Sequence, residues 1–380
     1  MSPPPGCILL FAEDPGAVNC IAPLAHELIH RGRIPLLLSA GHANILFCER
    51  GLVALPIMNE MHAVGMMPRL PGGRVVVGTS ENPDSPGFAL IAAARDAGVP
   101  SFGVIDSAAN AAFRFRGTTS EALAYAPDWL LVPDQWTAQE YRGLGFPAAR
   151  IVEVGHPQYD RVAVARATLA RRDRSELRGR LYPRAPRGAP IVVFVSEIST
   201  GLDPRQYQVS ADYTLHGRGV ARDRSAIVVE ELLDALNALH ADGLLDPYLV
   251  LRRHPKEQDE ALAAYLPHFD LVSRGGDPLE LIYAADLAVG MSSMLLIEAH
   301  LLGVPTLSIV PRIIERDWLP TVRAGVTPCA TDRHTVREWL RTWLAARPEH
   351  AALVDAPPPP HSRSSSSAAR MADFVSGTAE

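Results

Sequence analysis

The sequence predicts an α/β protein built from two Rossmann-like, doubly wound domains that face a cleft. Short β-rich runs alternate with longer helical patterns, the alternation stops at a stretch rich in Arg, Pro and Gly, and it then restarts. Such alternation is typical of βαβ units and parallel sheets. A chain of 380 residues is also long enough for two domains.

The first half predicts six strands separated by helical patterns. The strands are expected at 7–12, 34–40, 74–80, 101–106, 128–133 and 151–155. The clearest helices lie at 18–32 and 87–98, and the second is followed by a glycine suited to end a helix. Each strand is thus followed by a crossover segment, as a parallel sheet requires.

The alternation breaks in segment 161–190, which begins as an Arg-rich helix and continues into Pro and Gly. Five further strands are then expected, at 191–197, 248–254, 269–273, 287–291 and 305–310, with helices at about 223–241, 277–286 and 292–303. The domain organisation that follows is an N-terminal domain at 1–170, a linker at 171–190, a C-terminal domain at 191–350 and a low-complexity tail at 351–380.

Composition excludes several classes of protein. A formal net charge of −6 argues against a bulk binder of nucleic acid or of anionic membranes. The four cysteines form no CxxC pair and have no ligand-like spacing to His, which disfavours a disulfide framework and a zinc site. The apolar runs are too short for a signal peptide or a membrane span. We therefore expect a cytoplasmic protein.

Ligands of open α/β sheets bind at the carboxyl ends of the strands, so the residues after each predicted strand are candidates for a site. After the first strand, Gly16 lies in EDPGAVN (13–19), where the backbone and a helix start can approach an anion. An ordinary turn explains this segment equally well. It is not GxGxxG, which disfavours a dinucleotide cofactor.

Two further loops of the first half carry candidates for acceptor recognition. Asp106 follows a strand and can act as a general base on a hydroxyl, or can cap a turn. Asn110 and Arg114, or Arg116 beside it, are candidates to hold an anionic acceptor. His156 follows the strand at 151–155 and is expected to be exposed there as a candidate for acceptor binding, although a purely structural role is favoured for a lone histidine.

The segment LRRHPKE (251–257) runs off a buried-looking strand and contains Lys256, the one lysine among 36 Lys and Arg residues. Arg253, His254 and Lys256 are three potential cations at one strand end. His254 can donate to a phosphate, and lysine binds phosphate as a compact point charge. The alternative is a solvated basic turn, with the lysine an accident of composition.

The segment ADLAVGMSSMLLIEAHLLGVPTLSI (285–309) predicts a phosphate site. Ser292 and Ser293 follow a strand and open a helix, where hydroxyls and free N–H groups can bind an anion. Glu298 lies five residues after Ser293, roughly 7 to 8 Å along the axis, a spacing that suits a ribose next to a phosphate. N-cap serines and a solvated Glu are the alternative. A long polar loop begins at Ser196 and Glu197, with no role assigned to either residue.

No DxD triplet occurs in the chain, so the usual carboxylates of a metal-dependent nucleotide-sugar site are missing. We expect no metal and no cofactor. Positive charge and a helix start would then stabilise the leaving diphosphate in place of a metal.

These motifs resemble known families. The His-Pro at 254–255 followed by Ser-Ser at 292–293 is similar to motifs of bacterial polysialyltransferases, capsule Kdo transferases and CDP-glycerol glycerophosphotransferases. The segment IEAHLLGVPTLSI (297–309) resembles a stretch of non-hydrolysing UDP-N-acetylglucosamine 2-epimerases. The second half resembles the donor domain of GT-B glycosyltransferases, and the likeness covers most of 7–320, with 250–310 its specific part.

The resemblance implies a metal-independent transferase of bacterial polysaccharide biosynthesis. Its nucleotide-sugar donor would bind the domain at 191–350, and a sugar or glycoconjugate acceptor the domain at 1–170. His254 and the serine pair would contact the donor phosphates, Glu298 the ribose, and Asp106 would be the acceptor-side base. Any membrane association would come through the acceptor alone. A nucleotide-sugar 2-epimerase and a non-catalytic binding protein of the same fold are the alternatives.

Overall fold

The computed structural model describes residues 6–57, 65, 72–198, 210–221, 223–244, 246–255, 257, 260, 262–346 and 365–377. The chain divides into two units. Unit 1 comprises Met1–Asp160 and His361–Glu380, and unit 2 comprises Arg161–Pro360. No helix among the described residues is long and apolar enough to cross a membrane.

Unit 1 contains a seven-stranded sheet in the order β3-β2-β1-β4-β5-β6-β7, and all of its pairings are parallel. The strands are β1 (Ile8–Ala12), β2 (Leu36–Ser39), β3 (Leu55–Pro56), β4 (Arg74–Gly78), β5 (Ser101–Val104), β6 (Trp129–Val132) and β7 (Ile151–Glu153). All six strands predicted from the sequence are confirmed. The sequence missed β3, because two residues are too few to form a pattern.

Helices separate the strands of unit 1. They are α1 (Pro15–His30), α2 (Ala43–Glu49), α4 (Pro86–Asp96) and α5 (Gln135–Gly143), with 3₁₀ turns η2 (Ala111–Phe113) and η3 (Ala148–Arg150). Pro15 occupies the first turn of α1, where its missing N–H costs nothing. The buried residues of α1 pack on the sheet. The helix begins just after β1, so its free N–H groups lie at the carboxyl end of that strand.

Unit 2 repeats the same strand order in a six-stranded sheet, β10-β9-β8-β11-β12-β13, again with parallel pairings. The strands are β8 (Ile191–Val195), β9 (Tyr248–Arg252), β10 (Leu271–Ser273), β11 (Leu287–Gly290), β12 (Thr306–Ile309) and β13 (Cys329–Ala330). The five predicted strands are confirmed, and the two-residue β13 was missed. The prediction of two doubly wound, Rossmann-like domains is therefore confirmed for the architecture of each unit.

The helices of unit 2 include both long amphipathic segments and short buried ones. They are α7 (Arg174–Leu181), α9 (Arg224–Ala241), α10 (Pro278–Ala284), α11 (Met294–Leu302), α12 (Pro320–Arg323) and α13 (Arg333–Ala345), with η4 (Ala263–His268) and η5 (Ile313–Trp318). Every residue of β8 and β11 is buried. A strand that is covered by helices on both faces is buried along its whole length and is therefore a continuous apolar run. Such runs can be recognised in the sequence.

The predicted linker at 171–190 contains helical structure. Helix α6 (Pro157–Leu169) runs across the unit boundary, and α7 packs against α10. Arg174 and Arg178 both pair with the buried carboxylate of Asp286, at 3.3 and 2.7 Å. The arginines that suggested a solvated linker are therefore bound to unit 2, and their partner lies more than one hundred residues away in the sequence, where no local pattern reveals it.

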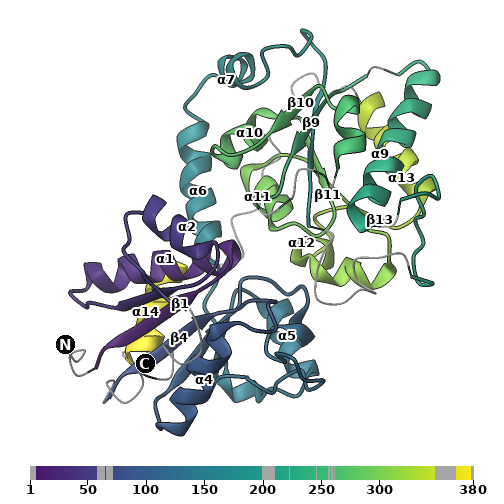
Figure 1. Ribbon diagram of the computed structural model, residues 1–380. Helices are drawn as coiled ribbons and strands as arrows, with labels where there is room; N and C mark the ends of the chain where they lie inside the picture. Colours follow the sequence, from purple (N-terminus) through teal and green to yellow (C-terminus); the bar gives the residue numbers. More distant parts are fainter. Residues whose placement is uncertain are drawn as a thin grey trace. The chain divides into compact units, whose positions relative to one another are not determined.

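Part of the predicted low-complexity tail forms a helix on unit 1. Helix α14 (Ser367–Ser376) packs against α1 (Figure 1). Its residues Met371, Ala372 and Val375 are buried, and the ring of Phe374 lies 5.1 Å from that of Trp129. The prediction of a tail over 351–380 is corrected for these residues. The Ser-rich sequence before α14 gave no sign of a helix. A helix of ten residues is marginal by itself and depends on packing, here against unit 1, for its stability.

We expect Met371→Ala to lower the free energy of unfolding of unit 1 by about 2–5 kcal/mol, because its side chain is fully buried. Urea denaturation followed by tryptophan fluorescence measures the change. The control on the same helix is Asp373→Ala, which removes a partly exposed ion pair with Arg31 and should cost less than about 1 kcal/mol. Equal effects of the two substitutions would contradict the packing role of α14.

Candidate functional site

The strand order of each unit reverses direction beside its first strand, and this switch point is where ligands bind in open α/β sheets. In unit 1 it lies between β1 and β4, and in unit 2 between β8 and β11. The loops that follow these four strands carry most of the polar side chains described below. We take the two switch points in turn, each within its own unit.

The loop after β4, Thr79-Ser80-Glu81-Asn82, connects the polar groups of the unit 1 switch point. Ser80 donates to Asp14 at 2.7 Å, and the Asn82 amide donates to Glu13 at 2.6 Å. These two bonds tie the end of β4 to the end of β1. Sequence reasoning missed this loop, because the signal, a run of four polar residues at a strand end, becomes meaningful only once β1 and β4 are known to be neighbours.

Asp106 and Arg114 form a buried ion pair at the end of β5. Arg114 Nη1 donates to Asp106 Oδ1 at 2.7 Å and to Thr79 Oγ1 at 3.1 Å, and Glu81 lies 3.5 Å from Nη2. Burial lowers the pKa of Arg114, but the carboxylates of Asp106 and Glu81 outweigh it and hold the pKa above its ordinary value. Arg114 is thus a permanent cation whose charge is already compensated.

These contacts correct the expected role of Arg114. Arg114 is 6% exposed and already pairs with two carboxylates, so it binds an anionic acceptor only if one of them is displaced. Arg116 lies instead over the ring of Phe113, at 4.1 Å. Asn110 has a left-handed backbone, with φ of 60°, and its amide donates to Glu81 at 2.9 Å. Asn110 and Arg114 therefore orient the acidic groups of this edge.

Gly16 is required by the position of Asp106. A Cβ atom on Gly16 would lie 1.9 Å from Asp106 Oδ2, far inside van der Waals contact. The backbone at the start of α1 therefore approaches the second oxygen of this carboxylate directly. The predicted close approach at Gly16 is present, and the group that approaches it here is a carboxylate of the chain itself.

His156 is buried, which corrects the expectation of an exposed acceptor-binding residue. Its side chain is 3% exposed, its Nδ1 accepts from the Gln158 N–H at 3.1 Å, and its Nε2 lies 3.7 Å from the Cys20 sulfur. The ring stacks on Tyr159 at 4.6 Å. The sequence placed His156 correctly after β7 but gave no sign that α6 and α1 cover it.

A network of two arginines and two glutamates lies at the unit 2 switch point. Arg224, the first residue of α9, is 2% exposed and pairs with Glu197 at 2.7 Å and with Glu315 at 2.5 Å. Arg312 pairs with the other oxygen of Glu315 at 2.7 Å. Both guanidinium groups lie over the ring of Trp318, at 5.5 and 5.6 Å. We call these four charged residues the Arg224 network.

The Arg224 network contacts one of the two predicted phosphate-binding serines. Ser292 donates its N–H to Glu197 Oε1 at 2.6 Å and its hydroxyl to Glu197 Oε2 at 3.0 Å. Arg224 Nη2 donates to the same hydroxyl at 3.0 Å. Ser293 is the N-cap of α11 and accepts from the Leu295 N–H at 3.3 Å. Sequence reasoning missed Arg224 and Arg312, because arginine is abundant throughout this chain. It also missed Glu315, which no motif singled out.

The end of β9 places His254 and Arg253 differently. The His254 N–H donates to Ser196 at 3.0 Å, and its side chain is partly exposed. Arg253 is buried and donates to Glu257 at 2.8 Å, so its charge is compensated within the loop. Lys256 lies outside the described residues. The structure describes two of the three expected cations, Arg253 and His254. Of these two, His254 is the partly exposed one.

Glu298 is 6% exposed on α11, two turns after Ser292. The predicted helix boundaries hold at both ends, since Ser293 caps the start and Gly303 ends the helix with φ of 84°. The roles of the serine pair and Glu298 in binding stay predictions. Among the described residues, no group of three or more His, Cys, Asp or Glu side chains is arranged to hold a metal ion.

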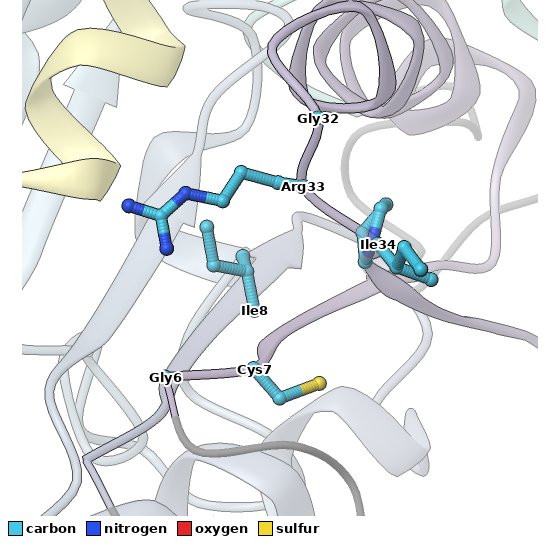
Figure 2. A pocket seen from close by; sticks show the side chains of 7 residues that line it. Gly6, Cys7, Ile8, Gly32, Arg33 and Ile34 are labelled. Carbon is cyan, nitrogen blue, oxygen red and sulfur yellow. The ribbon is translucent and has the colours of Figure 1, made fainter.

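An open pocket of about 200 Å³ lies elsewhere on unit 1. Figure 2 shows its lining residues, Gly6, Cys7, Ile8, Gly32, Arg33, Ile34 and Pro35. These residues precede or begin β1 and β2, so the pocket lies at the amino ends of the strands. It is therefore at the edge of the sheet opposite the switch-point loops and plays no part in the candidate site.

No protein-family model and no curated protein sequence matches the chain. Solved structures are similar in fold. A UDP-GlcNAc 2-epimerase from Neisseria meningitidis bound to UDP-GlcNAc has a TM-score of 0.63 at 14% identity, over 98% of each chain. The S. aureus MnaA–UDP co-structure has the same TM-score, identity and coverage. The wall teichoic acid polymerase TagF has a TM-score of 0.53 at 13% identity, over 98% of this chain and 88% of that one.

These likenesses define the class of the fold. The chain has the GT-B fold, which is shared by nucleotide-sugar epimerases and by polymerising transferases. The resemblance that the sequence suggested is confirmed at the level of this fold.

We expect Gly16→Ala to lower the free energy of unfolding by about 1–3 kcal/mol, because the new methyl group must displace Asp106. The same substitution in an Asp106→Ala background should cost less, since the obstructing oxygen is gone. Urea denaturation of the four proteins of this double-mutant cycle measures the difference.

The control is Gly143→Ala at the end of α5, where no atom lies within 4 Å of the added Cβ. This substitution should leave stability unchanged or raise it slightly. Additive costs of Gly16→Ala and Asp106→Ala would contradict the direct approach of the two residues.

Burial of His156 should make unit 1 less stable in acid. Burial lowers the pKa of His156 from its ordinary value of 6.5, so the unfolded chain binds this proton more readily than the folded chain. The free energy of unfolding therefore falls as the pH drops below about 6.5. We expect His156→Gln to lose less stability between pH 8 and pH 5 than the wild type does, as measured by urea denaturation. Equal losses would show that His156 titrates normally.

Proposed function

We propose that the protein is a metal-independent glycosyltransferase, or a related phospho-sugar transferase, that uses a nucleotide-activated donor. The observation that carries the proposal is the unit 2 switch point, where Ser292 and Ser293 open α11 beside the buried guanidinium of Arg224. Backbone N–H groups, hydroxyls and a fixed cation at a helix start are suited to a diphosphate. Two solved epimerases with this fold are described as bound to UDP-GlcNAc, one of them also to UDP, which makes uridine nucleotides the first candidates.

In this proposal His254 and the serine pair contact the donor phosphates, and Glu298 binds the ribose. Lys256 adds positive charge to the same loop. As the bond between the sugar and the diphosphate breaks, the leaving oxygen takes the electron pair, and His254 together with the N–H groups stabilises the new charge. Asp106 is proposed as the acceptor-side base, which accepts the proton of the acceptor hydroxyl as that oxygen attacks the sugar.

The acidic character of the unit 1 switch point bears on the acceptor. Glu13, Asp14, Glu81 and Asp106 gather there, and Arg114 is the arginine that pairs with two of them. Excess negative charge repels anions and favours hydroxyl or amine donors. We therefore propose a neutral or amine-bearing sugar as the acceptor, in place of the anionic acceptor that the sequence suggested.

A nucleotide-sugar 2-epimerase is the second candidate. It rests on fold neighbours named as UDP-GlcNAc 2-epimerases, with TM-scores of 0.60 to 0.64, as the transferase reading rests on TagF at 0.53 and the kitacinnamycin glycotransferase at 0.51. An epimerase needs no acceptor. Incubation with UDP-GlcNAc alone, followed by NMR, separates the two activities, since only the epimerase converts the sugar without a second substrate.

We expect a uridine nucleotide at about 100 times its dissociation constant to stabilise the protein by about 2.7 kcal/mol, measured by thermal shift against guanosine and cytidine nucleotides.

His254→Ala should lower kcat for release of the nucleotide by about 10²–10³-fold, since it removes a donor to the developing charge. The control is His240→Ala, because His240 is 65% exposed at the end of α9.

Activity of the protein should persist in EDTA. Loss of activity in EDTA would contradict a metal-independent mechanism, and no stabilisation by any nucleotide would contradict both candidate functions.

A further inference from the structure

We propose that Glu197 occupies the phosphate site of unit 2 in the free protein, and that the donor diphosphate binds by displacing it. Arg224 then becomes a phosphate-binding residue, and Glu197 is a built-in competitor that sets the affinity for the donor. This inference rests on the proposed function, which assigns a nucleotide-activated donor to this site. It adds a binding residue and a means of control that the sequence motifs do not indicate.

The first step of the inference is the set of donors around Glu197. Its Oε1 accepts from the Ser292 N–H at 2.6 Å, and its Oε2 accepts from Ser292 Oγ at 3.0 Å and from Arg224 Nη1 at 2.7 Å. A backbone N–H, a hydroxyl and a guanidinium are the groups that bind a phosphate edge. The carboxylate presents two acceptor oxygens and a negative charge, as one edge of a phosphate does.

The second step is that the donors keep their positions without Glu197. Arg224 Nε donates to Glu315 at 2.5 Å, and its Nη2 donates to the Ser292 hydroxyl at 3.0 Å. Glu315 is held in turn by Arg312. The guanidinium of Arg224 also lies over the Trp318 ring. Loss of the contact with Glu197 therefore leaves Arg224 oriented by three other neighbours.

The third step is that Glu197 is the member of the Arg224 network best able to move. Its side chain is 15% exposed, whereas that of Glu315 is fully buried at 0%. Glu197 lies two residues after β8 ends, in a loop, while Arg224 begins a helix of 18 residues. Rotation of one partly exposed side chain at a loop start requires no rearrangement of the core.

The fourth step is the balance of charge. The four residues of the Arg224 network carry two positive and two negative charges, and the exposed carboxylate of Asp212 lies a further 3.7 Å from Arg312. A diphosphate next to an undisplaced Glu197 would bring two negative charges within a few ångströms in a site shielded from water, which is strongly unfavourable. Departure of Glu197 removes one of the two carboxylates that pair with Arg224, and the diphosphate takes its place. The carboxylate and the phosphate therefore exclude one another.

The affinity of the protein for phosphate must then include the cost of displacing Glu197. Glu197→Gln should reduce that cost, because the amide is nearly the same size and carries no charge. We expect the variant to bind inorganic pyrophosphate, and UDP, at least about tenfold more tightly than the wild type, as measured by titration calorimetry at constant pH and salt. Equal or weaker binding by Glu197→Gln would overturn the inference.

The matched control is Glu315→Gln. It removes a carboxylate from the same guanidinium, but it leaves Ser292 bonded to Glu197. We expect no gain in affinity from this variant. A gain equal to that of Glu197→Gln would mean that net charge alone, and not occupation of the Ser292 donors, controls binding, and this would also overturn the inference.

A second measurement uses the wild type, with Trp318→Phe as its spectral reference, so it does not depend on whether the glutamate variants fold. Trp318 lies 5.5 Å from the guanidinium of Arg224, and its emission is isolated by subtracting the spectrum of Trp318→Phe. Saturating pyrophosphate should change this emission when Glu197 leaves Arg224. Saturation measured by calorimetry without any change in the Trp318 emission would overturn the displacement.

The failure of this inference differs from failure of the proposed function. If the wild type binds UDP as tightly as Glu197→Gln does, Glu197 is no competitor, while the donor site stands. If neither the wild type nor Glu197→Gln binds pyrophosphate or UDP, the proposed donor site is wrong, and the inference fails with it.

Discussion

The position of the first strand in the middle of each parallel sheet is the constraint on which the rest of the structure depends. Because β1 lies between β2 and β4, and β8 lies between β9 and β11, the strand order changes direction at these strands, and the loops at their carboxyl ends diverge and leave room for polar groups. Those groups come from segments far apart in the sequence. Glu13 and Asn82 meet in unit 1, and Glu197 and Ser292 meet in unit 2, across 69 and 95 positions of the chain.

The two switch points differ in how they balance charge. Unit 1 gathers carboxylates around Arg114, whereas the four residues of the Arg224 network in unit 2 carry two positive and two negative charges. In both units a buried guanidinium is acceptable because carboxylates surround it, since an unpaired charge in such a place would cost several kcal/mol.

Many features of the fold were predictable from the sequence, for identifiable reasons. Strands buried on both faces, such as β8 and β11, are continuous apolar runs, and Ser293 and Gly303 mark the ends of α11 chemically. The roles of Arg114 and His156 were not predictable, because both depend on what covers the side chain. A histidine after a strand and an arginine in a polar loop look the same in the sequence whether they face a ligand or lie beneath a helix.

The sequence by itself determined the order of strands and helices, the division into two Rossmann-like domains, and the motifs at 254–255 and 292–293. These depend on local patterns of burial and capping, which neighbouring residues record. Only the tertiary structure decided which groups meet. Asp106 lies against Arg114 and Gly16, and Glu197 contacts Arg224 and Ser292. The physical reason is that parallel sheets bring distant strand ends together, and no local pattern encodes the partner of a buried charge.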